Sequence, residues 1–330
     1  MRSFKHFALA ALLCAVAPPA LGQDKPVLDI YTYEGFASEW GPGPALKAGF
    51  EATCNCTIEF STAEDAISTL RKVQLEGAAT KADVVVGLDT ATSGDARATG
   101  LFAPHGLTPE GLVFDWSDAD FVPFDYGYFA YVYNKEKTPN PPTSFEELIA
   151  LPDTFKIVIQ DPRSSTPGLG NVVWVAEAYG DRAPEIWAGL KPHVLTMTRG
   201  WSEAYGLFLD GQADMVLSYT TSPAYHAIAE DDDKYAYAEF KEGYVAQIEV
   251  AGITKSSDQP ELGKAFLAYL MTPEAQKIIP TTNWMYPVID IGADLPAAFG
   301  KPPEHVLPVS EADLAAHGRA WVDAALAALQ

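Results

Sequence analysis

Short apolar runs alternate along the chain with longer segments in which apolar residues recur every three or four positions. Val27–Tyr33 and Ala82–Leu88 are rich in β-branched and aromatic residues, a composition that favours strands. Between these runs, apolar residues from Ile67 to Leu75 recur on one face, which predicts a helix over Asp65–Leu75. An alternation of strands and helices is typical of a mostly parallel sheet covered by helices. The pattern therefore predicts an α/β fold.

Two long extended runs, Phe121–Asn134 and Gly243–Ile253, enclose a second block of the same alternation. Inside this block, the pattern predicts strands over 156–160, 193–198 and 214–219 and helices over 145–151, 167–179, 202–209 and 222–229. After it, the clearest segments are helices over 260–271, 273–279 and 310–329. We therefore expect the chain to leave a first lobe, build a second lobe and return.

This organisation predicts two lobes joined by hinge strands. We expect 23–124 and 246–330 to form a discontinuous lobe 1 and 125–245 to form lobe 2. Ligands of open α/β sheets bind beyond the carboxyl ends of the strands, so two facing lobes would enclose an interdomain cleft. The same pattern is also compatible with one large α/β sheet.

The first 22 residues have the layout of a secretory signal peptide. Arg2 and Lys5 form a basic head, and the apolar run Phe7–Val16 that follows is too short to cross a bilayer comfortably. We expect cleavage near Gly22/Gln23 and a periplasmic mature protein. No later stretch reaches about 18 uninterrupted apolar residues, so the mature chain is not expected to be membrane-embedded.

The composition narrows the class of ligand. Apolar residues make up 48% and charged residues 20% of the 330 residues, which suffices for a sizeable core. The formal net charge of −22 repels nucleic acid and anionic lipid, so neither is expected as a partner, and it favours cationic ligands. An acidic surface also keeps exported proteins dispersed, so the charge alone does not establish a cationic ligand.

The three cysteines bear on lipidation, disulfide bonding and metal binding. Cys14 follows Leu13, where a lipidation signal would have a small residue. Cys54 and Cys56 are separated by one residue, so an oxidising compartment would permit a bridge that closes a very small ring. Two cysteines without a nearby histidine cluster cannot form a tetrahedral zinc site. The redox state of the pair stays open, and we expect no metal.

The motifs of the common enzyme classes are absent from the sequence. It contains no nucleophile elbow, Walker A loop, HExxH motif or GxGxxG fingerprint. The histidines are scattered through the sequence, and no pair of carboxylates is singled out by its spacing. We therefore expect neither catalytic residues nor a cofactor, and we interpret the chain as a binding protein rather than an enzyme.

Aromatic and hydroxyl residues instead gather in the loops between predicted strands and helices. Tyr33 ends the first strand and Asp65 opens a helix, and the other such loops are Arg163–Gly168, Gly200–Glu203, Tyr219–Tyr225 and Asn283–Pro287. Helix starts offer free N–H groups to a phosphate, and flat aromatic rings offer their faces to a cationic ring. Taken singly, each of these residues also has an ordinary role as a helix cap or a core aromatic.

Several of these segments resemble the periplasmic thiamine-binding proteins of enteric bacteria, the binding components of thiamine ABC importers. The stretches that carry the resemblance are Tyr31–Phe36, Glu39–Pro44, Phe121–Ala130, Gln160–Gly170, Gly200–Leu209, Leu217–His226 and Asn283–Pro287. Together they span nearly the whole mature chain, whereas Ile289–Val309 matches poorly. The resemblance implies a two-lobed type II periplasmic-binding-protein fold.

The resemblance also implies a ligand and partners. The ligand would be thiamine, thiamine monophosphate or thiamine diphosphate, which a monomeric protein would deliver to a membrane permease driven by an ATPase. The residues that it assigns to the ligand are Tyr33, Asp65, Ala66, Ser165, Thr166, Trp201, Tyr219, Thr220, Thr221, Ser222, Tyr225 and Trp284.

The resemblance gives these residues different roles. The heterocycles would be surrounded by Tyr33, Trp201, Tyr225 and Trp284. Asp65 and the backbone of Ala66 would hydrogen-bond the ligand. Ser165 and Thr166 would meet a phosphate, and the loop 219–222 would supply hydroxyls and amides. The family has glycine where this chain has Ala66, a change that leaves a backbone N–H contact intact unless φ must be positive.

Two other functions stay open at this point. One is a ferric-iron or small-oxyanion carrier of the same fold, although Tyr219 and Tyr225 stand six positions apart and no histidine accompanies Tyr33. The other is a secreted hydrolase whose catalytic carboxylates have no recognisable spacing. The sequence does not determine the preferred phosphorylation state of the ligand, the affinity or the oligomeric state.

Overall fold

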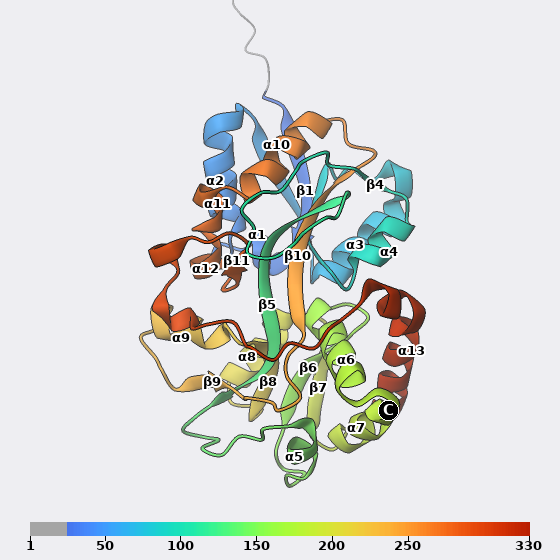
Figure 1. The fold of residues 1–330 in the computed structure, drawn as a ribbon, viewed down its shortest axis with the longest axis vertical. Helices are drawn as coiled ribbons and strands as arrows, with labels where there is room; N and C mark the ends of the chain where they lie inside the picture. Colours follow the sequence, from blue (N-terminus) through green and yellow to red (C-terminus); the bar gives the residue numbers. More distant parts are fainter. Residues whose placement is uncertain (1–24) are drawn as a thin grey trace, which may run out of the picture.

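The computed structural model describes residues 25–330, in which a mixed β-sheet runs through the molecule and helices pack around it (Figure 1). Residues 1–24, which include the expected signal peptide and Cys14, lie outside the described residues. The α/β class that the sequence predicts is confirmed.

The sheet has the strand order β2-β1-β3-β10-β5-β8-β6-β7, and β4, β9 and β11 pair beside this path. The strands are β1 (Val27–Tyr33), β2 (Thr57–Ala63), β3 (Val84–Asp89), β4 (Phe102–Ala103), β5 (Phe121–Asn134), β6 (Ile157–Gln160), β7 (Val194–Thr198), β8 (Met215–Tyr219), β9 (Tyr235–Tyr237), β10 (Ala246–Thr254) and β11 (Tyr286–Pro287). β1–β3 are parallel to one another, as are β6–β8, whereas β5 and β10 run antiparallel to their neighbours in this order.

The helices fill the connections between these strands. The α-helices are α1 (Glu34–Ala37), α2 (Gly43–Cys54), α3 (Ala66–Glu76), α4 (Ser93–Ala98), α5 (Phe145–Ile149), α6 (Thr166–Tyr179), α7 (Ala183–Leu190), α8 (Trp201–Leu209), α9 (Ser222–Ala229), α10 (Pro260–Leu270), α11 (Pro273–Gln276), α12 (Ile279–Thr282) and α13 (Glu311–Leu329). Short 3₁₀ helices are η1 (Gly77–Ala79), η2 (Gly180–Arg182), η3 (Gly292–Asp294) and η4 (Ala297–Phe299).

Two long strands join the halves of the molecule. β5 pairs with β10 as far as Tyr128 and with β8 from Phe129 onward, so one continuous strand belongs to both half-sheets. Figure 1 shows β5 and β10 side by side through the middle of the molecule. We call the elements around β1–β3 the upper half and those around β6–β8 the lower half. The sheet is continuous, yet its two ends belong to different halves.

Each half has its own hydrophobic core. In the upper half, Val84 of β3 is fully buried with Phe124 and Phe266. β3 is buried at every position, as expected for a strand covered on both faces. In the lower half, Trp174 of α6 is fully buried beside Tyr131 of β5. Each half therefore has the packing of a compact unit.

The predicted elements correspond closely to those observed. β1, β5 and α9 have the predicted bounds, and most others differ by one or two residues. The predicted strand over 243–253 begins later, at Ala246: Gly243 has a φ of 85°, and Tyr244 pairs only in an isolated bridge with Val306. The predicted helix over 273–279 is divided into α11 and α12. Three helices, α1, α4 and α7, were not predicted.

The final helix does not lie where the expected division places it. Residues 246–330 were assigned to lobe 1, but α13 packs against α6 and α7 in the lower half (Figure 1). Trp321 and Ala325 contact the core that contains Trp174. The apolar face of α13 predicts that this helix packs on something, but it does not identify the surface. The chain therefore passes between the halves once more before α13.

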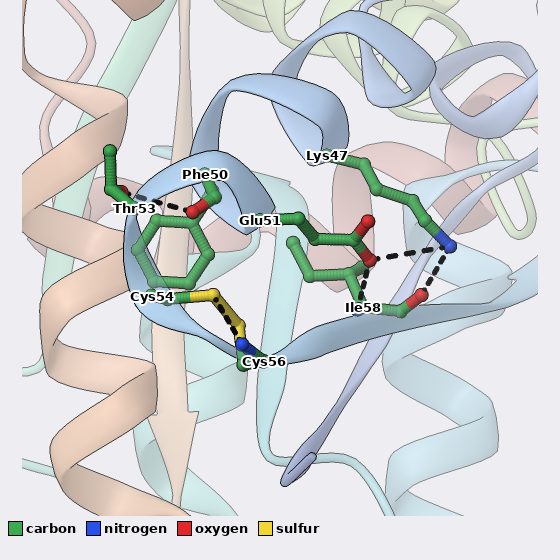
Figure 2. The surroundings of a disulfide bond; sticks show 7 residues. All are labelled: Lys47, Phe50, Glu51, Thr53, Cys54, Cys56 and Ile58. Carbon is green, nitrogen blue, oxygen red and sulfur yellow. Dashed lines mark hydrogen bonds and ion pairs between the residues drawn. A yellow bond between two sulfur atoms is a disulfide. The ribbon is translucent and has the colours of Figure 1, made fainter.

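Cys54 and Cys56 form a disulfide at the junction of α2 and β2 (Figure 2). Asn55 between them has a left-handed backbone with φ 51°, which ends the helix and turns the chain into the strand. Beside the bridge, Glu51 Oε1 accepts the Ile58 N–H at 2.7 Å. The structure thus answers a question that the sequence left open.

The packing of α6 generates a stability prediction. A Cβ added at Gly170 would lie 2.0 Å from Cε2 of Phe129, so Gly170→Ala should overpack the lower core and lower the free energy of unfolding by about 1–3 kcal/mol. Gly318, within α13, has open space around it, so Gly318→Ala should raise that free energy by up to about 1 kcal/mol. Urea denaturation measures both. A Gly170→Ala protein as stable as the wild type would contradict this packing.

Candidate functional site

A cavity of about 570 Å³ lies between the two halves, at the carboxyl ends of parallel strands from both. Its lining from the upper half and adjoining segments is Tyr33, Gly35, Trp40, Glu64, Asp65, Glu249, Thr281, Asn283, Trp284 and Met285. The lower half contributes Thr166, Pro167, Trp201, Ser202, Tyr205, Gly206, Leu209, Tyr219, Ser222, Tyr225 and Ala229. We call this space the cleft.

A second cavity of about 580 Å³ lies on the opposite face of β10. Ala246 and Ile248 line it, while Glu249 lines the cleft, because successive side chains of a strand point to opposite faces. Its charged residues include Arg97, which pairs with Asp118 at 2.6 Å and with Glu311. The lining of the second cavity is also acidic, but it has only two aromatic residues, Trp116 and Phe129, where the cleft has seven, so it is the weaker candidate for binding a flat ligand.

Asp65 links the two halves across the cleft. Its carboxylate caps α3 by accepting the Ala66 N–H at 2.7 Å, and it accepts the Ser165 hydroxyl from the lower half at 2.7 Å. The Thr166 N–H and hydroxyl lie farther away, each at 3.4 Å. Burial raises the pKa of Asp65, while these donors lower it. An anion therefore already occupies the beginning of α6 in this structure.

Other bonds also cross between the halves near Asp65. Glu64 forms an exposed ion pair with Arg199 at 2.7 Å, and the Ser68 hydroxyl donates to the Ser164 carbonyl at 3.3 Å. Exposed ion pairs contribute at most about 1 kcal/mol, so the buried bond between Asp65 and Ser165 is the more important of these contacts. The structure therefore has the two halves in direct contact beside the cleft.

Aromatic rings from both halves form the walls of the cleft. Tyr225 and Trp284 meet edge to face with their centroids 5.1 Å apart. Trp201 stacks on Tyr205 at 4.8 Å and donates its indole N–H to Ser218 at 2.8 Å, which fixes the plane of the indole. Flat side chains with fixed orientation are suited to stacking against a planar ligand.

Trp284 has an unusual backbone conformation. Its φ is 57°, in the left-handed region that bulky residues rarely adopt. Such conformations cost of order 1–3 kcal/mol and persist where the surroundings impose them, often at functional sites. Here the turn between α12 and β11 imposes it and directs the indole into the lining of the cleft.

A row of three buried carboxylates crosses neighbouring strands beside the cleft. Glu249 of β10 is in register with Asp89 of β3 on one side and with Asp125 of β5 on the other. All three are at most 6% exposed, and none forms an ion pair with a Lys, Arg or His of the described residues. Like charges directly opposite one another destabilise a sheet, so this row has a cost in stability.

Neutral hydrogen-bond donors hold this row in place. Glu249 accepts the Tyr33 hydroxyl at 2.9 Å and the Gln247 amide at 3.1 Å. Asp125 Oδ2 accepts the Asn283 amide at 2.6 Å. Asp125 Oδ1 is buried without a partner among the described residues. The Tyr33 hydroxyl also lies 3.2 Å from Asn283 Oδ1, and the Tyr219 hydroxyl donates to Gln247 Oε1 at 2.7 Å, so the network consists of neutral donors around the carboxyl groups.

Burial is the main cause of the pKa shifts in this row. It raises the pKa of Asp125 to about 8, even though the Asn283 amide acts in the opposite direction. Burial, and then repulsion from Asp125, raise the pKa of Glu249 well above its ordinary value. Burial also raises the pKa of Asp89 to about 6, although Thr92 donates to it. Asp125 and Glu249 thus retain protons at neutral pH, whereas Asp89 is mostly ionised.

The structure brings most of the sequence-predicted site residues together around the cleft. Those that line it are Tyr33, Asp65, Thr166, Trp201, Tyr219, Ser222, Tyr225 and Trp284. Ala66, Ser165, Thr220 and Thr221 do not line it. Ala66 and Ser165 instead donate to Asp65, as described above. The Thr220 and Thr221 hydroxyls are buried without a hydrogen-bond partner among the described residues.

Sequence reasoning missed Glu249, Trp40 and Tyr205 in the lining. It named the loop 283–287 but did not assign Asn283 or Met285 to the ligand. Trp40, 53% exposed, lies in a stretch that carried the family resemblance. Glu249 had a readable signal, because a charged residue in the middle of an apolar predicted strand requires a partner or a special environment.

Within residues 25–330, no group of three or more His, Cys, Asp or Glu residues has an arrangement that could hold a metal ion. In the same part of the chain, no helix has the length and apolar character needed to cross a membrane.

Comparisons with known proteins agree with this geometry. The family model described as bacterial extracellular solute-binding protein matches residues 45–299. The chain is 48% identical over 318 residues to the thiamine-binding periplasmic protein of Escherichia coli, covering 95% of this chain and 96% of that protein. It is 47% identical over 330 residues to the protein of the same name from Brucella abortus, covering 99% and 98%.

Solved structures share the fold. A periplasmic thiamin binding protein superposes with a TM-score of 0.90 at 48% identity, covering 93% of this chain and 97% of that one. A ferric binding protein from Campylobacter jejuni superposes with a TM-score of 0.73 at 17% identity, covering 91% and 99%. At that identity the second likeness concerns the fold alone, which is the two-lobed fold of periplasmic binding proteins that the sequence predicts.

The bond between Asp65 and Ser165 generates a prediction about the separation of the halves. Ser165→Ala leaves a buried Asp65 oxygen without its donor, which costs about 1–3 kcal/mol, so the halves should separate more often. The expected result is a larger radius of gyration of the unliganded protein by small-angle X-ray scattering. The control is Ser164→Ala, because the Ser164 hydroxyl donates to Arg199 within the lower half. Equal radii for both variants would contradict the role of this bond.

Proposed function

The chain belongs to the bacterial extracellular solute-binding proteins, and we propose that it captures thiamine, thiamine monophosphate or thiamine diphosphate in the periplasm and delivers it to an ABC importer permease. We also propose that it is exported by a cleavable signal peptide, acts as a monomer with no cofactor and has no catalytic activity. Proteins with the name thiamine-binding periplasmic protein match nearly its full length, which supports this assignment.

The observation that carries the proposal is the combination of aromatic walls and unbalanced carboxylates in one cleft. Thiamine consists of two flat heterocycles, one of which has a permanent positive charge. Aromatic rings bind such a ring through their faces, at about 0.5–2 kcal/mol each. The lining of the cleft contains Asp65 and Glu249 but no Lys or Arg. Its volume of about 570 Å³ lies within the usual range of about 300–1,000 Å³ for small-molecule sites.

We assign the heterocycles to the aromatic walls. Tyr33, Trp201, Tyr225 and Trp284 line the cleft from both halves, so a ligand among them contacts both halves at once. A ligand that contacts both halves only when they are together stabilises the closed form by its difference in affinity for the two forms. We propose that this closed form is what the permease recognises.

We assign a phosphate group, when the ligand has one, to the loop before α9. The Thr220 and Thr221 hydroxyls there have no partner among the described residues, and Tyr219 and Ser222 on either side line the cleft. Ser165 would be a second contact, but its hydroxyl already donates to Asp65. A phosphate at the beginning of α6 would therefore have to displace Asp65, which favours the loop before α9.

Titration with ligand tests the proposed function. Thiamine should bind with measurable heat and raise the melting temperature, because a ligand at a hundred times its Kd adds about 2.7 kcal/mol to the free energy of unfolding. The measurements are isothermal titration calorimetry and a thermal melt. Ferric citrate serves as the control and should produce neither a melting shift nor a visible charge-transfer colour. If thiamine and its phosphate esters all produce no heat and no shift, the assignment is wrong.

Removal of the aromatic walls should weaken binding. Trp284→Ala and Tyr225→Ala each remove a stacking surface, so each should raise the Kd for thiamine more than about tenfold, or about 1.4 kcal/mol. The control is Trp321→Ala, because Trp321 lies on α13 and does not line the cleft. Calorimetry gives the affinities, and circular dichroism checks that each variant is folded. An unchanged Kd in both wall variants would refute the stacking arrangement.

A further inference from the structure

The row of Asp89, Glu249 and Asp125 lowers the stability of the folded protein, and the fold alone does not explain why it is present. Glu249 and Asp125 are 6% and 0% exposed, on the two strands that join the halves. Buried carboxylates are ordinarily paired with a cation, since an unpaired buried charge is strongly unfavourable. No such partner forms an ion pair with them in residues 25–330. The missing partner is therefore expected to come from outside the chain.

Two independent features indicate that Glu249 and Asp125, which we call the pair, form part of a ligand site. Glu249 lines the aromatic cleft, so its carboxylate reaches the space where a ligand would lie. Asp125 Oδ1 is fully buried without a hydrogen-bond partner among the described residues. A carboxylate has about four acceptor positions, and Glu249 uses two of them for Tyr33 and Gln247. Acceptor positions therefore remain for a ligand.

We propose that Glu249, with Asp125 behind it, is the counter-ion subsite for the positively charged ring of the ligand, and that binding of this ring displaces a proton from the pair. The inference rests on the proposed function and deepens it, because it names the residue that selects a cation. It separates two tasks in the cleft. The aromatic walls would accept any flat ring of suitable size, whereas the pair would accept only a positively charged one.

The surroundings of Glu249 and Asp125 explain why this pair holds a proton before the ligand binds. Burial raises the pKa of both carboxyls, that of Asp125 to about 8, and repulsion from Asp125 raises that of Glu249 further, so the unliganded protein retains a proton on the pair at pH 7. A bound cation favours the ionised form, and the proton leaves to solvent. The affinity for the cation should therefore rise as the pH increases from about 6 to about 8, because a smaller fraction of the protein then holds a proton that the cation must displace.

The charged groups on neighbouring elements raise the pKa of Glu249, whereas the hydrogen bond from Tyr33 lowers it. Asp89 on β3 and Asp65 before α3 repel a charge on Glu249, and they raise its pKa further. Tyr33 on β1 and Tyr219 on β8 are neutral, because burial and then the charge of Glu249 raise their own pKa well above the ordinary value. The remaining neighbours, Gln247 and Asn283, do not titrate. No positive side chain of the described residues is among the causes that act on Glu249.

The experiment uses two probes and the full mature protein. One probe is thiamine, and the other is 3-deazathiamine, in which a neutral thiophene replaces the charged thiazolium. Calorimetry at pH 7 in phosphate and in Tris, buffers with different ionisation enthalpies, gives the number of protons released. For the wild type we expect release of up to about one proton with thiamine and none with the neutral probe.

The variants are Glu249→Gln and Asp125→Asn. Glu249→Gln should weaken thiamine at least about tenfold, leave the neutral probe within about twofold and release no proton. Asp125→Asn removes the repulsion on Glu249, so it should bind thiamine with a smaller proton release. The control is Glu261→Gln, a loss of the same charge on the exposed first turn of α10, which should behave as the wild type.

The stability of the empty protein gives a second readout that a merely structural role would not produce. The folded protein retains protons on the pair that the unfolded chain loses above about pH 4, so the pair lowers the free energy of unfolding as pH rises toward about 8. Glu249→Gln should therefore melt at a higher temperature than the wild type at pH 8 without ligand, although it binds thiamine less tightly.

The outcomes separate this subsite from the proposed function. The subsite is wrong if the wild type binds thiamine without releasing a proton, or if Glu249→Gln weakens the charged and the neutral probe equally. Either result leaves the proposed function intact. If the wild type binds neither probe, the proposed function is wrong and the subsite with it.

Discussion

The buried carboxyl groups in and beside the cleft, which have no cationic partner among the described residues, are the constraint on which the rest of the structure depends. Asp65, Asp89, Asp125 and Glu249 are all buried, and none has a cationic partner that forms an ion pair in residues 25–330. An arrangement of this kind lowers stability, and proteins retain such features mainly where function requires them. The two large cores and the continuous sheet provide the stability that offsets it. A positively charged ligand would complete the balance of charge.

The topology explains why these residues meet. The carboxyl ends of parallel strands in both halves face the same space, so the loops that follow them carry Tyr33, Asp65, Trp201 and Tyr219 to one cleft. β5 and β10 carry Asp125 and Glu249 across the junction between the halves. The halves can thus change their separation while the carboxylates stay on the strands that join them, and a ligand that bridges the walls favours the closed arrangement.

Much of this was predictable from local sequence. The long runs of β5 and β10, the helix caps and the clustering of aromatics at strand ends identified the fold class and most of the cleft, because each is a short-range signal. The position of α13 was not predictable, since an apolar face reveals that a helix packs but not on which surface. Glu249 and Asp125 were missed for a related reason. Their meeting depends on the register of strands far apart in the sequence. The bond between Asp65 and Ser165 likewise joins residues 100 positions apart.

A crystal structure of the protein with thiamine tests the account most directly. The account predicts the charged ring within about 4 Å of the Glu249 carboxylate, with the heterocycles between the walls formed by Trp284, Tyr225 and Trp201. Density for thiamine in the second cavity, or in the cleft with the charged ring directed away from Glu249, would contradict it.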